Sequence, residues 1–163
     1  MRYETFDGEV TEISPDVVEK AKRIRFIGLD FDGVFTDGTV YTDQNGVESV
    51  RCSRRDGLAL ADMLPPSGIQ ACIISKETNP VVEARAKKMK IPCYHRVSGA
   101  NDKLKIFTKA VEEKGLTLSE AAFMGDDLND VEAMRCAGFA CAPANAVGGA
   151  KAAAHFVTGR CGG

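Results

Sequence analysis

The stretch FIGLDFDGVFTDG, residues 26–38, decides the fold of this chain. Its apolar run, residues 26–29, leads directly into Asp30, Asp32 and Gly33. A short apolar run that ends in polar residues is typical of a buried strand in a parallel sheet, so we expect a strand whose carboxyl end carries the aspartates. Asp30 and Asp32 would share one face of a regular strand, and a turn at Gly33 can lift Asp32 above Asp30.

The segments around this strand predict an alternation of helices and strands. Ser14-Pro15 predicts a helix over residues 15–21 that Ser14 caps and Pro15 begins. Asn45-Gly46 between β-prone runs predicts a hairpin over residues 38–53 that protrudes after the first strand. We expect further helices at 58–64, 80–89, 101–114, 128–136 and 147–154, and further strands at 71–74, 91–95, 121–124 and 139–142. This order predicts an α/β fold with a three-layer, Rossmann-like parallel sheet, in a single domain over residues 1–163.

Composition limits the classes of partner. The chain has 163 residues, of which 44% are hydrophobic and 27% charged, as in a globular domain. Its net charge of −2 provides no basic field for nucleic acid or an anionic membrane. The six cysteines form no CxxC pair, and the N-terminus lacks the apolar stretch of a signal peptide. We therefore expect a cytoplasmic protein without nucleic-acid or membrane partners.

Polar residues follow three of the predicted strands, at Asp30 and Asp32, at Ser75-Lys76 and at Asp126-Asp127. The carboxyl ends of parallel strands meet at one edge of a sheet, where ligands bind. Clustered carboxylates repel one another unless a hard cation lies among them, and oxygen ligands favour Mg²⁺. Two carboxylates in different surroundings can act as a nucleophile and as a proton donor and acceptor.

Other residues predicted near this edge suit a phosphoryl group. Ser75 offers a hydroxyl, Lys103 offers an ammonium at the start of a helix, and Gly33 lets backbone amides approach closely. The arginines on or after the hairpin could supply a counter-charge for a carboxylate on the substrate, and Arg55 is the candidate we favour.

Taken together, these residues resemble the four motifs of the haloacid dehalogenase (HAD) superfamily of phosphotransferases: DxDGVxTDG at residues 30–38, Ser75, Lys103, and GDDLND at residues 125–130. The first motif is similar to that of the branch without a large cap domain, which includes 3-deoxy-D-manno-octulosonate (KDO) 8-phosphate phosphatases. The phosphatase domain of bacterial N-acylneuraminate cytidylyltransferases is the other similar group.

The resemblance implies a role for each of these side chains. Asp30 is the implied nucleophile, which becomes an aspartyl phosphate, and Asp32 the general acid and then base. Ser75 and Lys103, with Gly33, are implied to bind the phosphoryl oxygens. The implied Mg²⁺ ligands are Asp30, the Asp32 carbonyl and Asp126. Asp127 and Asp130 are implied to support them.

The implied substrate is an acidic sugar phosphate, a phosphorylated 3-deoxy-2-ulosonic acid. KDO 8-phosphate and a nonulosonate (sialic acid) 9-phosphate both remain open, since Lys76-Glu77 follows Ser75 where many KDO 8-phosphate phosphatases have Gly-Arg. Arg55 and Lys76 are the candidate contacts to the sugar.

Without a cap domain, selectivity would come from the hairpin and neighbouring subunits, and members of this branch are similar in being homotetramers. Related chains commonly continue past a Gly-Gly pair with an Arg-containing tail, and without one we expect a more open site.

Two alternatives belong to other functional classes. A phospho-accepting receiver module also gathers acidic residues and a lysine at strand ends, but it has no use for a general base such as Asp32. A degenerate phosphatase domain could serve as the tetramerisation partner of a cytidylyltransferase. The presence of Asp30, Asp32, Lys103 and Asp126 argues against this second alternative.

Overall fold

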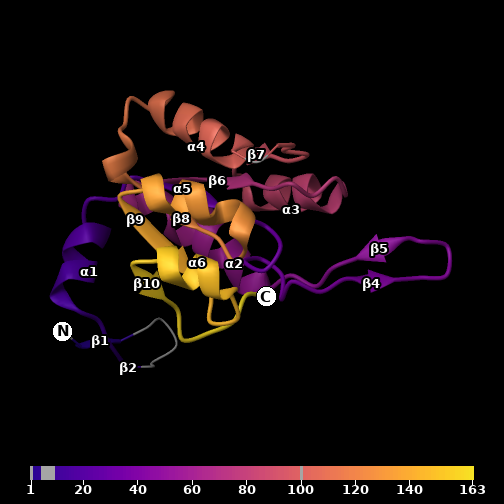
Figure 1. Cartoon of the computed structure of the whole chain (residues 1–163), viewed down its shortest axis with the longest axis horizontal. Helices are drawn as coiled ribbons and strands as arrows, with labels where there is room; N and C mark the ends of the chain where they lie inside the picture. The colour runs from indigo at the N-terminus through magenta and orange to yellow at the C-terminus, as the bar shows by residue number, and fades with distance from the viewer. Residues whose placement is uncertain (1, 5–9, 100) are drawn as a thin grey trace.

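A six-stranded parallel sheet forms the centre of the molecule (Figure 1). The computed structural model describes residues 2–4, 10–99 and 101–163. Along the sheet the strand order is β10-β9-β8-β3-β6-β7. The strands are β3 (Phe26–Leu29), β6 (Gln70–Ile74), β7 (Cys93–Tyr94), β8 (Ala121–Met124), β9 (Phe139–Ala142) and β10 (Phe156–Val157). The stretch that begins at residue 26 thus provides a central strand.

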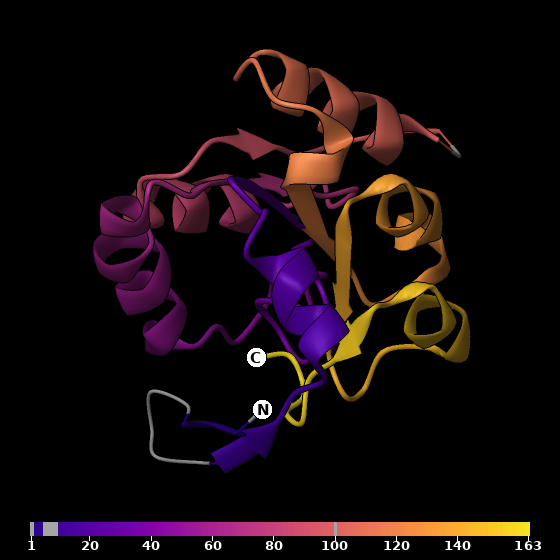
Figure 2. The same cartoon turned by 90° about the vertical axis from the view of Figure 1, so that its left-hand side faces the viewer.

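Helices cover both faces of the sheet and complete three layers (Figure 2). One face packs against α4 (Asp102–Glu112), α5 (Val131–Cys136) and α6 (Gly148–Ala153). The other packs against α1 (Pro15–Ala21), α2 (Arg54–Leu58) with the π-helical turn η1 (Ala59–Met63), and α3 (Val81–Met89). Short 3₁₀ turns lie at η2 (Pro65–Ser67), η3 (Leu118–Glu120) and η4 (Leu128–Asp130). The predicted α/β layering is confirmed.

Alternation along β3 explains why both faces are apolar. Phe26 packs into one core with Phe107 of α4 and Phe123 of β8, whereas Leu29 packs into the other core, with α3. Gly28 lies so close to the first core that a Cβ there would come within 2.8 Å of the Phe123 ring. A glycine at this position therefore allows the aromatic cluster to press against the strand.

The connection of the strands places the chemistry. Leu29 of β3 pairs with Ile73 of β6 on one side and with Met124 of β8 on the other. The chain reaches β6 first and returns to β8 only after two helices, so the order reverses between these neighbours. Ligands bind at the carboxyl ends of strands beside such a reversal, and Asp30 and Asp126 follow the two strands concerned.

Between β3 and α2 the chain makes the predicted hairpin, formed by β4 (Tyr41–Thr42) and β5 (Glu48–Ser49), and no larger insertion. It extends away from the sheet (Figure 1). In the turn of the hairpin, Asp43 Oδ1 accepts hydrogen bonds from the amides of Asn45 and Val47, and Gly46 has a φ of 77°. The Asn-Gly pair is thus used as its conformational preferences require.

Some boundaries differ from the sequence-based expectation. The helix expected at 58–64 begins at Arg54, because Ser53 Oγ accepts a hydrogen bond from the Arg55 amide and caps it, and it then continues as η1. The strand expected at 91–95 is confined to β7, since Pro92 has no amide hydrogen to donate. The sequence analysis missed β10 and the antiparallel pair β1 (Arg2–Glu4) and β2 (Val10–Glu12). Strands of two or three residues carry too little periodicity to detect.

Among the described residues, no helix has the length and apolar composition needed to cross a membrane.

Candidate active site

Asp30 lies directly beyond β3, at the edge where the strand order reverses. Its amide donates to the Met124 carbonyl of β8 over 2.9 Å, so the pairing of the two strands continues to this residue. Its side chain is folded back onto the chain, where Oδ1 accepts a 2.7 Å hydrogen bond from the Phe31 amide. Asp30 is 5% exposed. The carboxylate is therefore held in one orientation at the floor of the site.

Lys103, the second residue of α4, lies between two carboxylates. Its Nζ is 2.7 Å from Asp30 Oδ2 and 2.7 Å from Asp130 Oδ1, and it is 2% exposed. Burial alone would lower the pKa of Lys103, but the two carboxylates raise it overall, so the ammonium stays charged. Burial raises the pKa of Asp30 well above its usual value, and Asp130 adds to the shift, whereas Lys103 opposes it.

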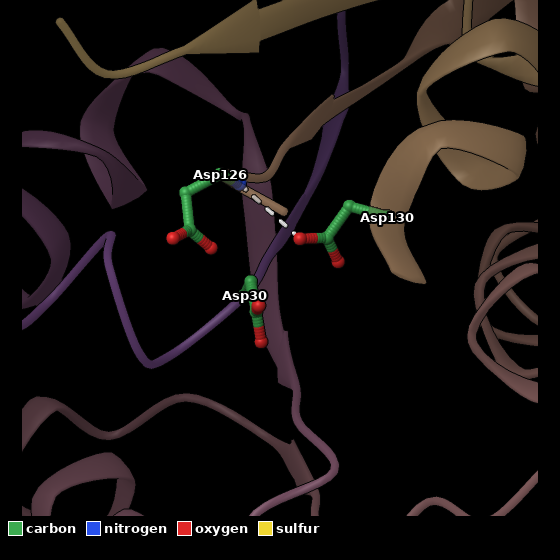
Figure 3. A group of neighbouring side chains, drawn as sticks. All are labelled: Asp30, Asp126 and Asp130. Atoms are coloured by element: carbon green, nitrogen blue, oxygen red, sulfur yellow. Dashed lines mark hydrogen bonds between the residues drawn. The ribbon is translucent and has the colours of Figure 1, made fainter. Parts of the chain in front are cut away.

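Asp130, at the end of η4, has no exposed surface and organises the loop after β8. While its Oδ1 pairs with Lys103, its Oδ2 accepts hydrogen bonds of 3.2 Å from the amides of Asp126 and Asp127 (Figure 3 shows the first). Gly125 allows this close packing, because a Cβ there would lie 2.5 Å from the Asp130 carboxyl carbon. Such contacts suit the supporting role that the motif implies for Asp130.

Three carboxylates, one after β3 and two from the loop after β8, could hold a metal ion (Figure 3). One oxygen each of Asp30, Asp126 and Asp130 lie within 4.8 Å of one another. An oxygen-only donor set suits Mg²⁺. Burial and the negative charges of Asp130 and Asp127 together raise the pKa of Asp126 to about 6, although Lys103 opposes the shift. The acidic cluster therefore fits a divalent cation, which would relieve this repulsion.

This cluster differs in one member from the ligand set that the resemblance implies. Asp130 belongs to it, although its two oxygens already pair with Lys103 and with backbone amides. The carboxylate of Asp32 does not belong to this cluster. The implied ligand at Asp32 is its main-chain carbonyl, and that assignment stays a prediction.

Asp32 lines the same cavity as Asp30 but is partly exposed. Burial raises its pKa, as do the nearby Glu77 and Glu48, whereas Lys103 and a hydrogen bond from Thr36 lower it. Asp30 and Asp32 thus have distinct environments: the first is fixed beneath a buried ammonium, and the second stands at the opening. This is the difference that a nucleophile and a proton donor require.

Gly33 has a φ of 75°, a conformation that glycine adopts without strain. Its amide donates to Thr36 Oγ1 over 3.2 Å. A Cβ on Gly33 would collide with the Asp126 carboxylate, coming within 2.8 Å of its Oδ1. The structure therefore provides a reason for glycine that the sequence analysis missed, while the phosphate-binding role of Gly33 stays a prediction.

A cavity of about 170 Å³ opens above these residues. It brings together most of the predicted site residues, along with Gly38, Glu77 and Asn129, which the sequence analysis did not assign to the site. The residues that line it are Asp30, Asp32, Gly38, Ser75, Lys76, Glu77, Lys103, Asp126, Asp127 and Asn129. Ser75 is 1% exposed, and its Oγ accepts a hydrogen bond from the Glu77 amide, so its hydroxyl hydrogen remains for a ligand. The cavity has the size and polarity for a phosphoryl group.

A larger cavity of about 480 Å³ lies elsewhere, among mainly apolar side chains that include Phe26, Leu60 and Met89. Phe26 begins β3, so this cavity is at the amino ends of the strands, away from the aspartates. We place the chemistry in the smaller cavity, because it alone of these two contains the acidic cluster and Lys103.

Glu77 and Asn129 are the lining residues that the sequence analysis missed. Asn129 Oδ1 is buried and has no hydrogen-bond partner among the residues that the structure describes. A signal was available for both, since Glu77 follows Ser75 by two residues and Asn129 lies within the motif at residues 125–130. Arg55, by contrast, does not line the cavity and is exposed near the start of α2, while Arg51 pairs at 3.4 Å with Asp37.

Known proteins are similar to this chain in sequence and in fold. The KDO 8-phosphate phosphatase of Escherichia coli K12 is 35% identical over 134 residues, which cover 82% of this chain and 70% of that enzyme. The crystal structure of the Moraxella catarrhalis phosphatase, in complex with a magnesium ion, a phosphate ion and KDO, is 33% identical, with a TM-score of 0.83 over 91% of this chain and 83% of that one. The corresponding Yersinia pestis structure is 30% identical, with a TM-score of 0.86 over 99% of this chain and 84% of that one.

A family model confirms the resemblance independently. Residues 72–161 match the haloacid dehalogenase-like hydrolases, a range that includes Ser75, Lys103 and the acidic loop after β8. The first motif lies before this range, and it is placed beside the acidic loop by the pairing of β3 with β8. By its sequence, fold and relatives, this chain belongs to the haloacid dehalogenase-like hydrolase family.

Proposed function

We propose that this chain is a Mg²⁺-dependent phosphomonoesterase whose substrate is KDO 8-phosphate. The observation that carries the proposal is the contact of Asp30 with Lys103 at the floor of a polar cavity, with Asp32 at its opening. The curated relative at 35% identity is a phosphatase of this substrate, and the Moraxella structure contains magnesium, phosphate and KDO. Each of these supports the proposal from a different direction.

In the first half-reaction, an Asp30 carboxylate oxygen attacks phosphorus. The bond from phosphorus to the sugar oxygen breaks, and the Asp32 carboxyl gives its proton to that leaving oxygen. Asp32 suits this step because its pKa is raised by burial and by neighbouring glutamates. The product is an aspartyl phosphate on Asp30 and a free sugar acid.

In the second half-reaction, the Asp32 carboxylate removes a proton from water. The water oxygen attacks phosphorus, the bond to Asp30 breaks, and inorganic phosphate leaves. Lys103 and the Ser75 hydroxyl face the cavity where the phosphoryl oxygens would lie. When bound, Mg²⁺ would be held by Asp30, Asp126 and the Asp32 carbonyl, with Asp127 and Asp130 in support, and would neutralise negative charge.

We assign the sugar end of the substrate to Lys76, which lines the cavity and is exposed. Its ammonium provides a counter-charge for the carboxylate of an ulosonic acid. Glu77 lies beside it, and a carboxylate there can accept hydrogen bonds from sugar hydroxyls. A nonulosonate 9-phosphate has the same two charged groups, so it is the competing substrate to test.

We also propose that the chain forms a homotetramer through its hairpin. Val40, Tyr41 and Val47 expose 49%, 67% and 64% of their surfaces, and a lone two-stranded hairpin is marginally stable in water. A symmetric contact between copies would bury these side chains. Since Arg55 does not line the cavity of its own chain, a role for it in substrate binding would require the cavity of a neighbouring copy.

A phosphate-release assay tests the function. KDO 8-phosphate, a sialic acid 9-phosphate and glucose 6-phosphate are compared with Mg²⁺ present, and Asp30→Asn protein serves as the blank. We expect the highest kcat/KM for KDO 8-phosphate. Preference for the sialic acid phosphate would change the substrate and keep the chemistry, whereas equal use of glucose 6-phosphate would refute recognition of an ulosonic acid.

The same assay separates the alternative functions. A receiver-like module would accumulate a stable phosphoprotein without turnover, and a degenerate scaffold would release no phosphate from any of the three compounds. Either result would refute the phosphomonoesterase.

A further inference from the structure

The segment after β10 returns across the sheet edge to the candidate active site. Ala144 donates a 2.9 Å backbone hydrogen bond to the Arg160 carbonyl, and the Gly162 amide donates to Asn145 Oδ1 over 3.0 Å. The Gly163 amide then donates to the Val34 carbonyl, next to Gly33. In Figure 1 the C-terminus accordingly lies beside the base of the hairpin. This segment is thus anchored at several successive points.

Gly162 lies against the backbone of the nucleophile loop, which we define as residues 30–38. A Cβ on Gly162 would collide with the Gly33 carbonyl oxygen and lie 2.6 Å from the Thr36 carbonyl oxygen. A separation under 3.0 Å is essentially never adopted by a real Cβ atom. Gly163 has a φ of 97°, and its Cβ would lie 2.8 Å from the Asp37 amide nitrogen. The approach therefore requires glycine at both positions.

Gly33 is in close contact with two partners. Its carbonyl meets Gly162, while its α-carbon meets the Asp126 carboxylate. The peptide of Gly33 is consequently confined by the C-terminal segment and by a member of the acidic cluster. A displacement of Gly33 would therefore change the room available to Asp126, because the space between them is too small for a Cβ.

Asn145 connects the C-terminal segment and the nucleophile loop a second time. Its side-chain oxygen accepts the Gly162 amide, and its Nδ2 donates to the Asp37 carbonyl over 3.4 Å. Asn145 itself is exposed, so its role here is in these hydrogen bonds and not in the core. The loop thus receives a steric constraint from the C-terminal segment and a hydrogen-bonded constraint from Asn145, which also holds that segment.

We propose that Gly162 and Gly163, which we call the glycine pair, are positioning residues that fix the Gly33 peptide and thereby the spacing between Asp126 and Asp30. The pair acts through the nucleophile loop and does not contact substrate. The proposal rests on the proposed function in one respect, that Asp126 helps to hold Mg²⁺. Residues that orient metal ligands typically affect metal affinity or activity by about 10-fold to 100-fold.

The test uses two variants and a matched control. Gly162→Ala introduces the collision, and Asn145→Ala removes the hydrogen-bonded constraint at an exposed position. Gly159→Ala is the control, because it lies in the same segment, has no atom within 4 Å of its Cβ position and does not have a positive φ. All three should have melting temperatures near that of the wild type, since none of these residues lies in a buried core.

Two measurements distinguish positioning from a general effect on folding. Hydrogen exchange of the amides in residues 31–38 reports on the nucleophile loop without metal or substrate, and calorimetric titration with Mg²⁺ alone reports on the acidic cluster. In Gly162→Ala we expect faster exchange in this loop and Mg²⁺ affinity weakened by about 10-fold or more. Asn145→Ala should change both in the same direction, and Gly159→Ala should match the wild type.

The results also separate this proposal from the function it uses. If the wild type binds no Mg²⁺, the metal site of the proposed function fails, while loop exchange still decides whether the glycine pair confines the loop. If the wild type binds Mg²⁺ and Gly162→Ala binds it equally well, the positioning role is wrong. Should Gly162→Ala fail to fold, unchanged exchange and affinity in Asn145→Ala would overturn the proposal.

Discussion

The Lys103 ammonium lies 2.7 Å from the Asp30 carboxylate, and both groups are almost completely buried. The same ammonium is 2.7 Å from Asp130, which in turn accepts the amides of Asp126 and Asp127. The candidate nucleophile is therefore connected through one lysine to the loop that carries the metal candidates. Removal of this cation should disturb both the stability and the chemistry of the site.

Lys103→Met should lower the free energy of unfolding by about 3–5 kcal/mol, because it leaves two buried carboxylates without their cation. Lys105→Met is the matched control on the same helix, since Lys105 is 75% exposed and pairs with Asp102 at the surface. Urea denaturation at pH 7.5 measures both. Equal stability of the two variants would show that the buried ion triad is not structurally important.

Asp30→Asn should remove the nucleophile and lower kcat by a factor on the order of 10³ or more. The amide is nearly isosteric, and its one oxygen can keep the contact either with Lys103 or with the Phe31 amide, so the fold should be retained. Phosphate release by purified protein measures the effect, with circular dichroism as a check of folding. Wild-type turnover by this variant would refute Asp30 as the nucleophile.

Asp32→Asn keeps the nucleophile and removes the group that transfers protons. We expect kcat to fall by about 10²–10⁴-fold for a sugar phosphate, whose leaving oxygen needs a proton. A substrate with a good leaving group, such as p-nitrophenyl phosphate, should depend less on Asp32 in its first step. Rapid-quench kinetics should then reveal a burst of nitrophenol, followed by slow hydrolysis of the aspartyl phosphate. An identical rate reduction for both substrates, without a burst, would contradict the acid role.

The sequence was sufficient to predict the central strand, the layering and the hairpin, since these depend on local patterns such as residues 26–33 and Asn45-Gly46. It also predicted that Asp30, Ser75, Lys103 and Asp126 would meet, because parallel strands bring their carboxyl ends to one edge. What it could not predict depends on contacts between distant segments. No local pattern reveals that Asp130 shares Lys103 with Asp30, or that Gly162 approaches Gly33.

The raised pKa of Asp126 predicts a pH-dependent affinity for Mg²⁺. In the metal-free protein this carboxyl has a pKa of about 6, above the ordinary 3.8, so the folded state holds its proton more tightly than the unfolded state. Stability from this group is thus greatest at low pH and is lost as pH rises from about 4 through 6. Mg²⁺ must displace the proton, and its affinity should therefore weaken as pH falls below about 6.

Thermal unfolding with and without Mg²⁺ between pH 5 and pH 8 measures this effect. The stabilisation by Mg²⁺ should be small at pH 5 and reach its full value above pH 7. Asp126→Asn should lose most of the stabilisation at every pH, whereas Asp16→Asn, an exposed change in α1, should behave as the wild type. Stabilisation that is independent of pH would show that Asp126 does not compete with a proton for the metal.

The hairpin carries the side chains that we expect to form the contact between copies of the chain. Tyr41 and Val47 lie on its two arms and are largely exposed, so a contact between copies of the chain would bury both. Replacement of both by aspartate should place charges in that contact and convert the proposed homotetramer to smaller species. The stability of the sheet should change little, because the hairpin extends away from it (Figure 1). The conservative pair Tyr41→Phe and Val47→Ile should keep the assembly.

Light scattering of the wild type and the two double variants measures the mass, and phosphate release measures whether turnover falls when the assembly is lost. A monomeric wild type with full activity would refute the tetramer, and full activity in a dissociated double aspartate variant would show that each site is complete within one chain.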